Sequence, residues 1–421
     1  MIGLDGELFE PGSAGYEELR RPADLAYRHV RPRCVVACRT VRDVAATVAY
    51  AAAHGERLVP RGGGHCFAGR SSTDGIQLDL GRLDSVQLDS HGIATLGAGV
   101  RLGRMYAALH AAGRTLPAGC GAGVGIAGLT LGGGIGLLGR AHGLTCDRLV
   151  GAQVVLADGS VVECDGDREP ALFWALRGAG GGQFGVVTPL QFDTVAEPTA
   201  VRIEALLGDV DLDELVAAWQ AWAPTAPREV TVNLTVVSEP GEPVTARLFG
   251  ASLLGETTTR ELLAGYPVRL RADMAFHQLK RSFDEPSTGR DVRSRSALWA
   301  HPMSRQTVSS LMAALAEPRP AGRREIAFTA MGGAYDDLAA NATAFAHRDQ
   351  RFLVEHIGAP DDPWVDVSWA LARGSGRVYP NFPDPVLDNA RTAYHAGNLP
   401  RLEAVKKTYD SQRFFDFPQA I

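Results

Sequence analysis

The sequence predicts an α+β protein built from two parts and a returning tail. Residues 1–198, with a core at about 31–197, alternate short helical and strand-like patterns and hold the glycine clusters of the chain. Residues 199–378 lack such clusters and alternate longer strands with amphipathic helices, which indicates a second sheet covered by helices on one side. The stretch 379–421 is polar and aromatic, so we expect it to pack back onto the first part.

The first part contains the clearest local signals. Apolar residues between Thr40 and His54 recur at the spacing of one helical face, and Gly55 suits the end of that helix. Segment 154–163 predicts a hairpin, because two β-branched strands flank an Asp-Gly pair that tolerates the positive φ of a tight turn. The other elements expected here are strands at 57–60, 76–80 and 94–99 and a helix at about 102–112.

In the middle part, the spacing of the apolar residues predicts amphipathic helices and half-buried strands. Leu212, Leu215, Val216, Trp219 and Trp222 share one helical face. The remaining elements expected here are strands at 230–237, 245–251 and 324–331 and a helix at 304–316.

Composition excludes several classes of protein. The chain of 421 residues is 45% apolar and 21% charged, with a net charge of −6, which argues against a disordered chain and a nucleic-acid-binding face. It has no apolar run long enough for a membrane helix, and its acidic start does not resemble a signal peptide. Six cysteines without paired CxxC spacing predict free thiols and no metal site. We expect a cytoplasmic monomer or homodimer.

The first glycine cluster follows a strand and reads Arg61-Gly62-Gly63-Gly64-His65-Cys66. Residues without Cβ let the main chain approach a bulky anion and aim several N–H groups at it. Arg61 adds a charge that can pair with phosphate. A merely flexible loop is the alternative, although three adjacent glycines between apolar strands cost folding entropy.

The second cluster, residues 119–136, holds nine glycines in eighteen positions. Gly123, Gly125 and Gly128 form a literal GxGxxG, and Asp147 lies 19 residues further on, as in a Rossmann dinucleotide site. The context argues against that alternative: Pro117 precedes the motif, and residues 132–134 are glycines where a helix should continue. An extended backbone along a large planar ligand fits better.

The third cluster covers residues 178–185 and follows a helical segment, PALFWALR. Three clusters within about 125 residues predict one long ligand, with phosphates at one end and a flat ring at the other.

Four motifs, taken in order, resemble a known flavoprotein family. They are RGGGH at 61–65, VGIAGLTLGGGIG at 124–136, LFWALRGAGGGQFGVVT at 172–188 and YDSQRFFDFPQAI at 409–421. They resemble the vanillyl-alcohol oxidase/p-cresol methylhydroxylase superfamily, and within it the berberine-bridge-enzyme-like oxidases.

The resemblance implies a PCMH-type FAD-binding domain made of the N-terminal part and the C-terminal tail, with a substrate domain between them. It implies that His65 bonds covalently to the 8α-methyl group of FAD. The positions it assigns to the cofactor are Arg61, Gly62, Gly63, Gly64, His65, Cys66, Gly69, Cys120, Val124, Gly125, Gly128, Leu129, Gly133, Gly136, Gly185, Val187, Asn381 and Asn398.

A second covalent bond, from a cysteine in a TCPxVG-like segment, is common in that branch. Alignment on Val124-Gly125 puts Gly121 at the cysteine's place and Cys120 one residue early, and such a shift in an extended loop turns the side chain the other way. We therefore expect a single histidyl bond, with Cys120 as a possible second link. Val124 matches a position where a small side chain leaves room for O2, which favours an oxidase.

The chemistry needs a base for the substrate O–H or N–H proton while hydride leaves the carbon. Related carbohydrate oxidases use a tyrosine in a YxNY segment, and here Tyr379-Pro380-Asn381-Phe382 has phenylalanine at the second aromatic position. The candidates for the acid/base role are therefore Tyr379 and His347, each with a structural role as the alternative.

These observations predict an FAD-dependent oxidase of a small or medium organic substrate, with O2 as the acceptor. Phe382 favours an aromatic, secondary-metabolite-like substrate over a sugar. The alternatives are an FAD-dependent dehydrogenase, a carbohydrate or alcohol oxidase, a non-catalytic FAD- or nucleotide-binding protein, and a nicotinamide-dependent Rossmann enzyme.

Overall fold

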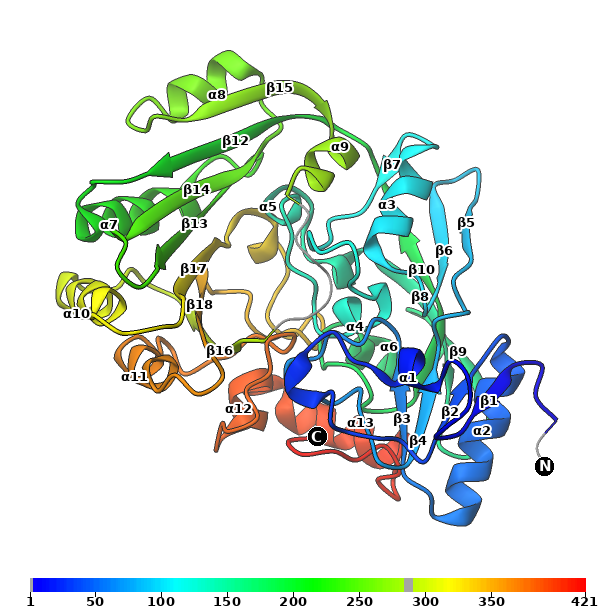
Figure 1. The fold of residues 1–421 in the computed structure, drawn as a ribbon. Coiled ribbons are helices and arrows are strands. Elements are labelled where there is room, and N and C mark those ends of the chain that lie inside the picture. The colour runs from blue at the N-terminus through cyan, green and yellow to red at the C-terminus, as the bar shows by residue number, and fades with distance from the viewer. Residues whose placement is uncertain (1–2, 284–290) are drawn as a thin grey trace.

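The computed structural model describes residues 3–283 and 291–421, which form two parts lying side by side (Figure 1). One part holds the N-terminal elements and the C-terminal helices, and the other is built on one large sheet. The mixture of helices and sheets confirms the predicted α+β class. No helix in the described ranges is long and apolar enough to cross a membrane.

The N-terminal part contains two main sheets. In the first, three parallel strands carry one antiparallel edge strand, and the order is β1 (Glu7–Phe9), β2 (Cys34–Ala37), β4 (Ile76–Asp79) and β3 (Leu58–Arg61). The second is antiparallel, in the order β5 (Val86–Leu88), β6 (Ile93–Gly97), β10 (Val186–Asp193), β8 (Leu149–Val155) and β9 (Val161–Cys164). A two-stranded ribbon joins β7 (Arg114–Thr115) to β11 (Val195–Ala196).

Local sequence signals determine several of these elements. Helix α2 (Val41–His54) starts at a capping box between Thr40 and Asp43 and ends at Gly55, whose φ is +64°. Strands β8 and β9 pair antiparallel across a turn in which Gly159 has φ +82°. Both predicted elements are confirmed.

Short helices connect these sheets. They are α1 (Tyr16–Arg20), α3 (Leu102–His110), α4 (Ile126–Leu131), α5 (Gly139–His142) and α6 (Pro170–Leu176).

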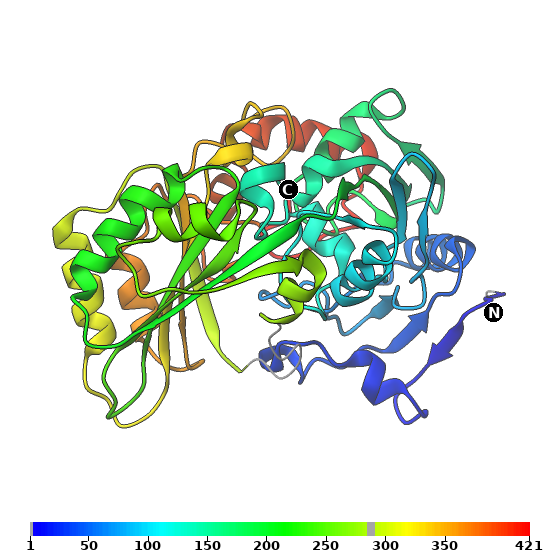
Figure 2. The same cartoon turned by 90° about the horizontal axis from the view of Figure 1, so that it is seen from above.

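The second part is a seven-stranded antiparallel sheet. Its order is β15 (Arg269–Ala275), β12 (Thr199–Leu207), β14 (Thr245–Ser252), β13 (Val230–Ser238), β17 (Arg324–Ala330), β18 (Phe352–Gly358) and β16 (Arg293–Trp299). Helices α7 (Leu212–Trp222), α10 (Arg305–Ala316) and α11 (Trp364–Leu371) cover its outer face, away from the N-terminal part (Figure 2). Helices α8 (Glu256–Leu262) and α9 (Phe276–Arg281) flank β15 in the chain. The predicted helix at 212–222 and strands at 230–237, 245–251 and 324–331 are confirmed.

The inner face of this sheet meets the N-terminal part. Alternate residues of β18 show this arrangement: Phe352 and Val354 pack in the core under the helices, whereas Leu353 packs with Tyr379 and Cys146. The inner face of the sheet therefore borders the second glycine cluster and the chain after residue 378.

The C-terminal chain forms α12 (Ala390–His395) and α13 (Leu399–Tyr409) and then runs extended to Ile421. Leu402, Val405, Phe415 and Ile421 are buried in the hydrophobic core of the N-terminal part. Lys406 fixes this return, because its buried ammonium group donates to Asp410 at 2.7 Å and to Gln183 O at 2.5 Å.

Candidate functional site

The first two glycine clusters pack backbone against backbone. A Cβ atom added to Gly63 would lie 2.2 Å from Gly125 N, so any larger residue would push the two loops apart. Arg101 spans the same junction, donating to Gly123 O at 2.7 Å and to Gly63 O at 3.3 Å. Segments about sixty residues apart in the chain therefore form one wall.

The third cluster joins this wall from the other side. Gly180 N donates to Leu131 O, at the end of α4, over 2.7 Å. Gly182 faces the ring of Phe417 in the C-terminal tail, and the Arg70 guanidinium lies 5.0 Å from the same ring. The three clusters and the tail thus converge, as one long ligand would require.

His65 lies in the chain between two contacts of this arrangement. Gly64 before it has φ +73°, a conformation that favours glycine and turns the chain at this point. Two residues before His65, Gly63 packs on Gly125, and two residues after it, Phe67 stacks on Phe382 with ring centroids 5.2 Å apart. His65 therefore stands between the glycine wall and an aromatic pair.

Tyr379 connects the tail to the second cluster. Its Oη accepts hydrogen bonds from Gly134 N at 3.0 Å, Ile135 N at 3.1 Å and Asn381 Nδ2 at 3.0 Å. The second N–H of the Asn381 amide donates to Leu129 O at 2.8 Å, which fixes the orientation of that amide. Burial raises the pKa of Tyr379, so the phenol stays neutral. With three N–H groups on its oxygen, Tyr379 fixes the position of the second glycine loop, and its acid/base role stays a prediction.

The residues fit a cofactor with a diphosphate and a flat ring. Gly128 has no heavy atom within 4 Å of an added Cβ, and the nearest to Gly181 is 3.8 Å away, so these glycines border open space. Arg70 Nε and Ser71 Oγ, just after the first cluster, are buried and have no hydrogen-bond partner among the described residues. Unpaired polar atoms beside an N–H-rich loop are what an anionic ligand would satisfy.

The predicted pairing of Arg61 with phosphate is wrong. The Arg61 side chain is 3% exposed and donates to Ser71 O at 2.9 Å, Leu19 O at 3.2 Å and Ser72 Oγ at 3.0 Å. Burial lowers the pKa of Arg61 to about 10. Arg61 therefore holds the loop from behind, and only its main chain belongs to the wall.

The acid/base role predicted for His347 and the cofactor contact predicted for Asn398 are also wrong. His347 is 0% exposed, its Nε2–H donates to Tyr394 O at 2.9 Å, and burial lowers its pKa to about 4, so it cannot reach a substrate. The Asn398 amide donates to Ala340 O at 2.7 Å and to Thr343 O at 3.1 Å. It ties α13 to the loop before His347 instead of facing the flavin ring.

The other predicted cofactor positions divide into open and packed ones. Cys66, Val124 and Leu129 are half-buried along the wall. Five positions are glycines or core residues held by close packing: Gly69 against Tyr27, Gly133 against Phe345, Gly136 against Ala118, Gly185 against Val154, and Val187 within the sheet core.

Cys120 faces away from the wall. Its Sγ accepts a hydrogen bond from Lys280 Nζ of α9 at 3.2 Å. Gly121, which stands at the aligned cysteine position, would place a Cβ 3.1 Å from Val124 Cγ2. A single histidyl link stays a prediction, and the orientation of Cys120 favours it.

Glu355 is a candidate that the sequence analysis missed. Strand alternation puts Glu355 on the same face of β18 as Leu353, which is the inner face, and the strand register pairs it with Ser296 of β16 and Ala327 of β17. A half-buried carboxylate thus lies next to the aromatic cluster around Tyr379. The signal is the polar pair Glu355-His356 within the otherwise apolar strand FLVEHIG, and alternation places His356 on the outer face with Val354.

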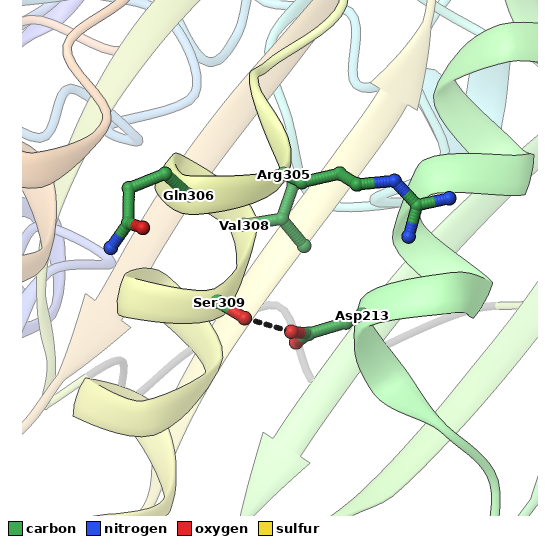
Figure 3. Close-up of a pocket in the computed structure, with 5 residues that line it drawn as sticks. All are labelled: Asp213, Arg305, Gln306, Val308 and Ser309. Carbon is green, nitrogen blue, oxygen red and sulfur yellow. Dashed lines mark hydrogen bonds between the residues drawn. The ribbon is translucent and has the colours of Figure 1, made fainter.

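One cavity lies on the opposite side of the sheet. It has about 230 Å³ between α7 and α10, where Ser309 donates to Asp213 and Arg305 extends into solvent (Figure 3). Its lining residues lie on the helical surface, and we assign it no role in the chemistry.

Three converging glycine loops closed by a returning C-terminal tail fit an FAD-binding oxidoreductase. The family models agree: residues 32–165 match an FAD binding domain and residues 378–421 match the berberine and berberine-like family. An FAD-linked oxidoreductase of Bacillus subtilis is 30% identical to this chain. The alignment covers 99% of this chain and 97% of the relative.

Two further relatives align with different shares of this chain. (R)-6-hydroxynicotine oxidase of Paenarthrobacter nicotinovorans is 34% identical over 53% of this chain and 46% of its own length. A solved structure of glucooligosaccharide oxidase from Acremonium strictum, described with 6-S-cysteinyl, 8α-N1-histidyl FAD, aligns with a TM-score of 0.90 at 25% identity over 99% of this chain and 97% of its own. The chain belongs to the berberine-bridge-enzyme-like family of FAD-linked oxidoreductases, and its cofactor is FAD.

Proposed function

We propose that this chain is an FAD-dependent oxidase of an alcohol or amine, with Glu355 as the base, O2 as the electron acceptor and H2O2 as the product. Bound FAD supplies the hydride acceptor. The observation that carries the proposal is the carboxylate of Glu355 on the inner face of the sheet, beside Leu353 and the aromatic cluster around Tyr379.

Each side chain of the site has a separate task. Glu355 accepts the O–H or N–H proton of the substrate as hydride leaves the adjacent carbon. Tyr379 and Asn381 hold the second glycine segment in place. Phe67 and Phe382 form a stacked apolar wall that suits an aromatic, secondary-metabolite-like substrate.

A carbohydrate is the second candidate substrate. The likeness to glucooligosaccharide oxidase extends along nearly the whole chain, and flat aromatic rings also bind sugars. Phe382 supports the aromatic substrate instead, because it removes the hydroxyl group that the YxNY segment of related carbohydrate oxidases carries.

Substitution of Glu355 tests the proposal. In E355Q the amide cannot accept the proton, so we expect kcat/KM to fall by roughly 10²- to 10⁴-fold with flavin content unchanged. Glu325→Gln is the matched control, because Glu325 lies on the same face of the neighbouring strand, paired with Ile357. Activity is measured as peroxide release from a panel of aromatic alcohols, amines and oligosaccharides. Wild-type rates in E355Q with the best substrate would refute the role of Glu355.

Reoxidation separates an oxidase from a dehydrogenase. The flavin is reduced anaerobically by the best substrate and then mixed with air-saturated buffer. We expect reoxidation within seconds and stoichiometric peroxide. Reoxidation over minutes would favour a dehydrogenase that uses another acceptor.

A further inference from the structure

Cys120 and Lys280 form a pair at the junction of the two parts. Helix α9 lies against α3 in both views (Figure 1, Figure 2), and Lys280 Nζ donates to Ala118 O at 2.9 Å and to Cys120 Sγ at 3.2 Å. The pair borders a cavity of about 180 Å³ that Tyr106 and His277 also line. Cys120 is half-buried, so a small molecule that enters this cavity reaches its sulfur.

Lys280 has an unusual environment for a lysine of this chain. The chain has three lysines among its 42 basic Lys and Arg residues. Lys406 is also buried but pairs with Asp410, whereas no carboxylate pairs with Lys280 within residues 3–283 and 291–421. The Lys280 side chain is 2% exposed, and this burial lowers its pKa. A lysine that loses its proton becomes a nucleophilic amine, which an arginine at this position would not provide.

We propose that hydrogen peroxide joins Cys120 and Lys280 through a reversible sulfenamide bond between Sγ and Nζ. In the first step the thiol is oxidised to sulfenic acid, and peroxide is reduced: RSH + H2O2 gives RSOH + H2O. In the second step the neutral amine attacks the sulfur and hydroxide leaves with the amine proton as water: RSOH + R′NH2 gives RS–NHR′ + H2O. The sum removes two hydrogen atoms from the protein and needs no other oxidant.

The other cysteines lack this arrangement. Cys34, Cys38, Cys146 and Cys164 are buried, and burial raises the pKa of each thiol. Cys66 is half-buried like Cys120, but the hydrogen bonds of the buried Lys280 and Lys406 go to other partners among the described residues. Oxidation of Cys66 therefore stops at sulfenic acid or proceeds to higher acids.

The bond links the substrate part to the flavin part. Cys120 lies four residues before Val124 in the loop that packs on the first glycine cluster, and Lys280 lies on α9, which follows β15 of the seven-stranded sheet. The cross-link would restrict movement between them. Turnover as the source of peroxide rests on the proposed function, whereas the bond itself does not.

Peptide mapping of the peroxide-treated holoprotein tests the proposal. Reagent H2O2 is added without substrate, so a protein that shows no oxidase activity is still tested. Digestion without reductant should yield a peptide that joins the chain around Cys120 to the chain around Lys280, about 2 Da lighter than the sum of the two. Dithiothreitol should restore both peptides.

Variants at Lys280 distinguish the Cys120–Lys280 cross-link from oxidation of the Cys120 thiol alone. Lys280→Arg keeps N–H donors at this position without a nucleophilic amine, and Lys280→Met keeps an apolar stem if the arginine does not fit. In either variant we expect no cross-link and trapping of Cys120 sulfenic acid by dimedone. Cys66→Ala is the control and should retain the cross-link.

Three results would overturn the proposal. The first is wild-type Cys120 recovered only as thiol or sulfinic acid while Cys66 is oxidised. The second is a joined peptide about 14 Da heavier than the sum of the two peptides, which means that an oxygen atom was inserted. The third is a Cys120 peptide that carries FAD.

Discussion

At the scale of the residue, Arg140 of α5 joins the two parts of the molecule from a fully buried position. It donates to Val230 O at 2.9 Å, Pro224 O at 2.9 Å, Ala226 O at 2.5 Å and Met331 O, all in the second part. Arg140→Met leaves these carbonyls unpaired, so we expect a loss of about 3–5 kcal/mol of unfolding free energy, read from denaturant unfolding.

The matched control for Arg140 is an exposed arginine pair. Arg228 binds Asp337 with both side chains about half exposed, so Arg228→Met should cost roughly 1 kcal/mol or less. Equal losses in the two variants would contradict the role assigned to Arg140.

Residue identity was easier to predict than side-chain direction. Asn381, predicted as a cofactor position, lies beside the second glycine cluster, yet Arg61, His347 and Asn398 turn onto protein carbonyls. A motif records which residue is present, while its direction depends on segments distant in the chain. Glu355 was missed for the same reason, since its face is defined only once β18 is paired.

At the scale of the element, the contact between the first two glycine loops sets the width of the FAD wall. In Gly63→Ala the new methyl group would overlap the backbone of Gly125, so we expect a loss of roughly 1–3 kcal/mol and incomplete FAD incorporation. The measurement is the ratio of flavin to protein absorbance, together with Tm. Gly166→Ala is the control, because a Cβ there meets no atom within 4 Å. Full flavin content in Gly63→Ala would contradict this account.

Elements were predictable wherever the signal was local. The caps of α2 and the Asp-Gly turn between β8 and β9 lie within a few residues of the elements they define. The order of the seven-stranded sheet was not predictable, because β16 pairs with β18 across more than fifty residues and lies beyond β17 in the sheet. Such pairings depend on burial of a shared face and leave no short motif.

At the scale of the whole molecule, three buried histidines predict how stability depends on pH. His347, His356 and His395 are each at most 1% exposed, and burial lowers their pKa values from 6.5 to about 4, 3 and 3. In the unfolded chain they take up protons below about pH 6.5, whereas in the folded chain they stay neutral. Their contribution is therefore constant above that pH and is lost as the pH falls toward 4.

We expect Tm to be nearly flat between pH 8 and 7 and to fall steeply between pH 6 and 4.5, with up to about 1.4 kcal/mol lost per pH unit for each histidine. His356→Leu isolates one contribution, because both ring nitrogens of His356 lack hydrogen-bond partners among the described residues and its cross-strand neighbour Arg295 is a cation that cannot accept a proton from it. This variant should show a shallower acid slope, while the exposed control His91→Leu should keep the wild-type slope. Parallel slopes in wild type and His356→Leu would show that acid sensitivity arises elsewhere in the molecule.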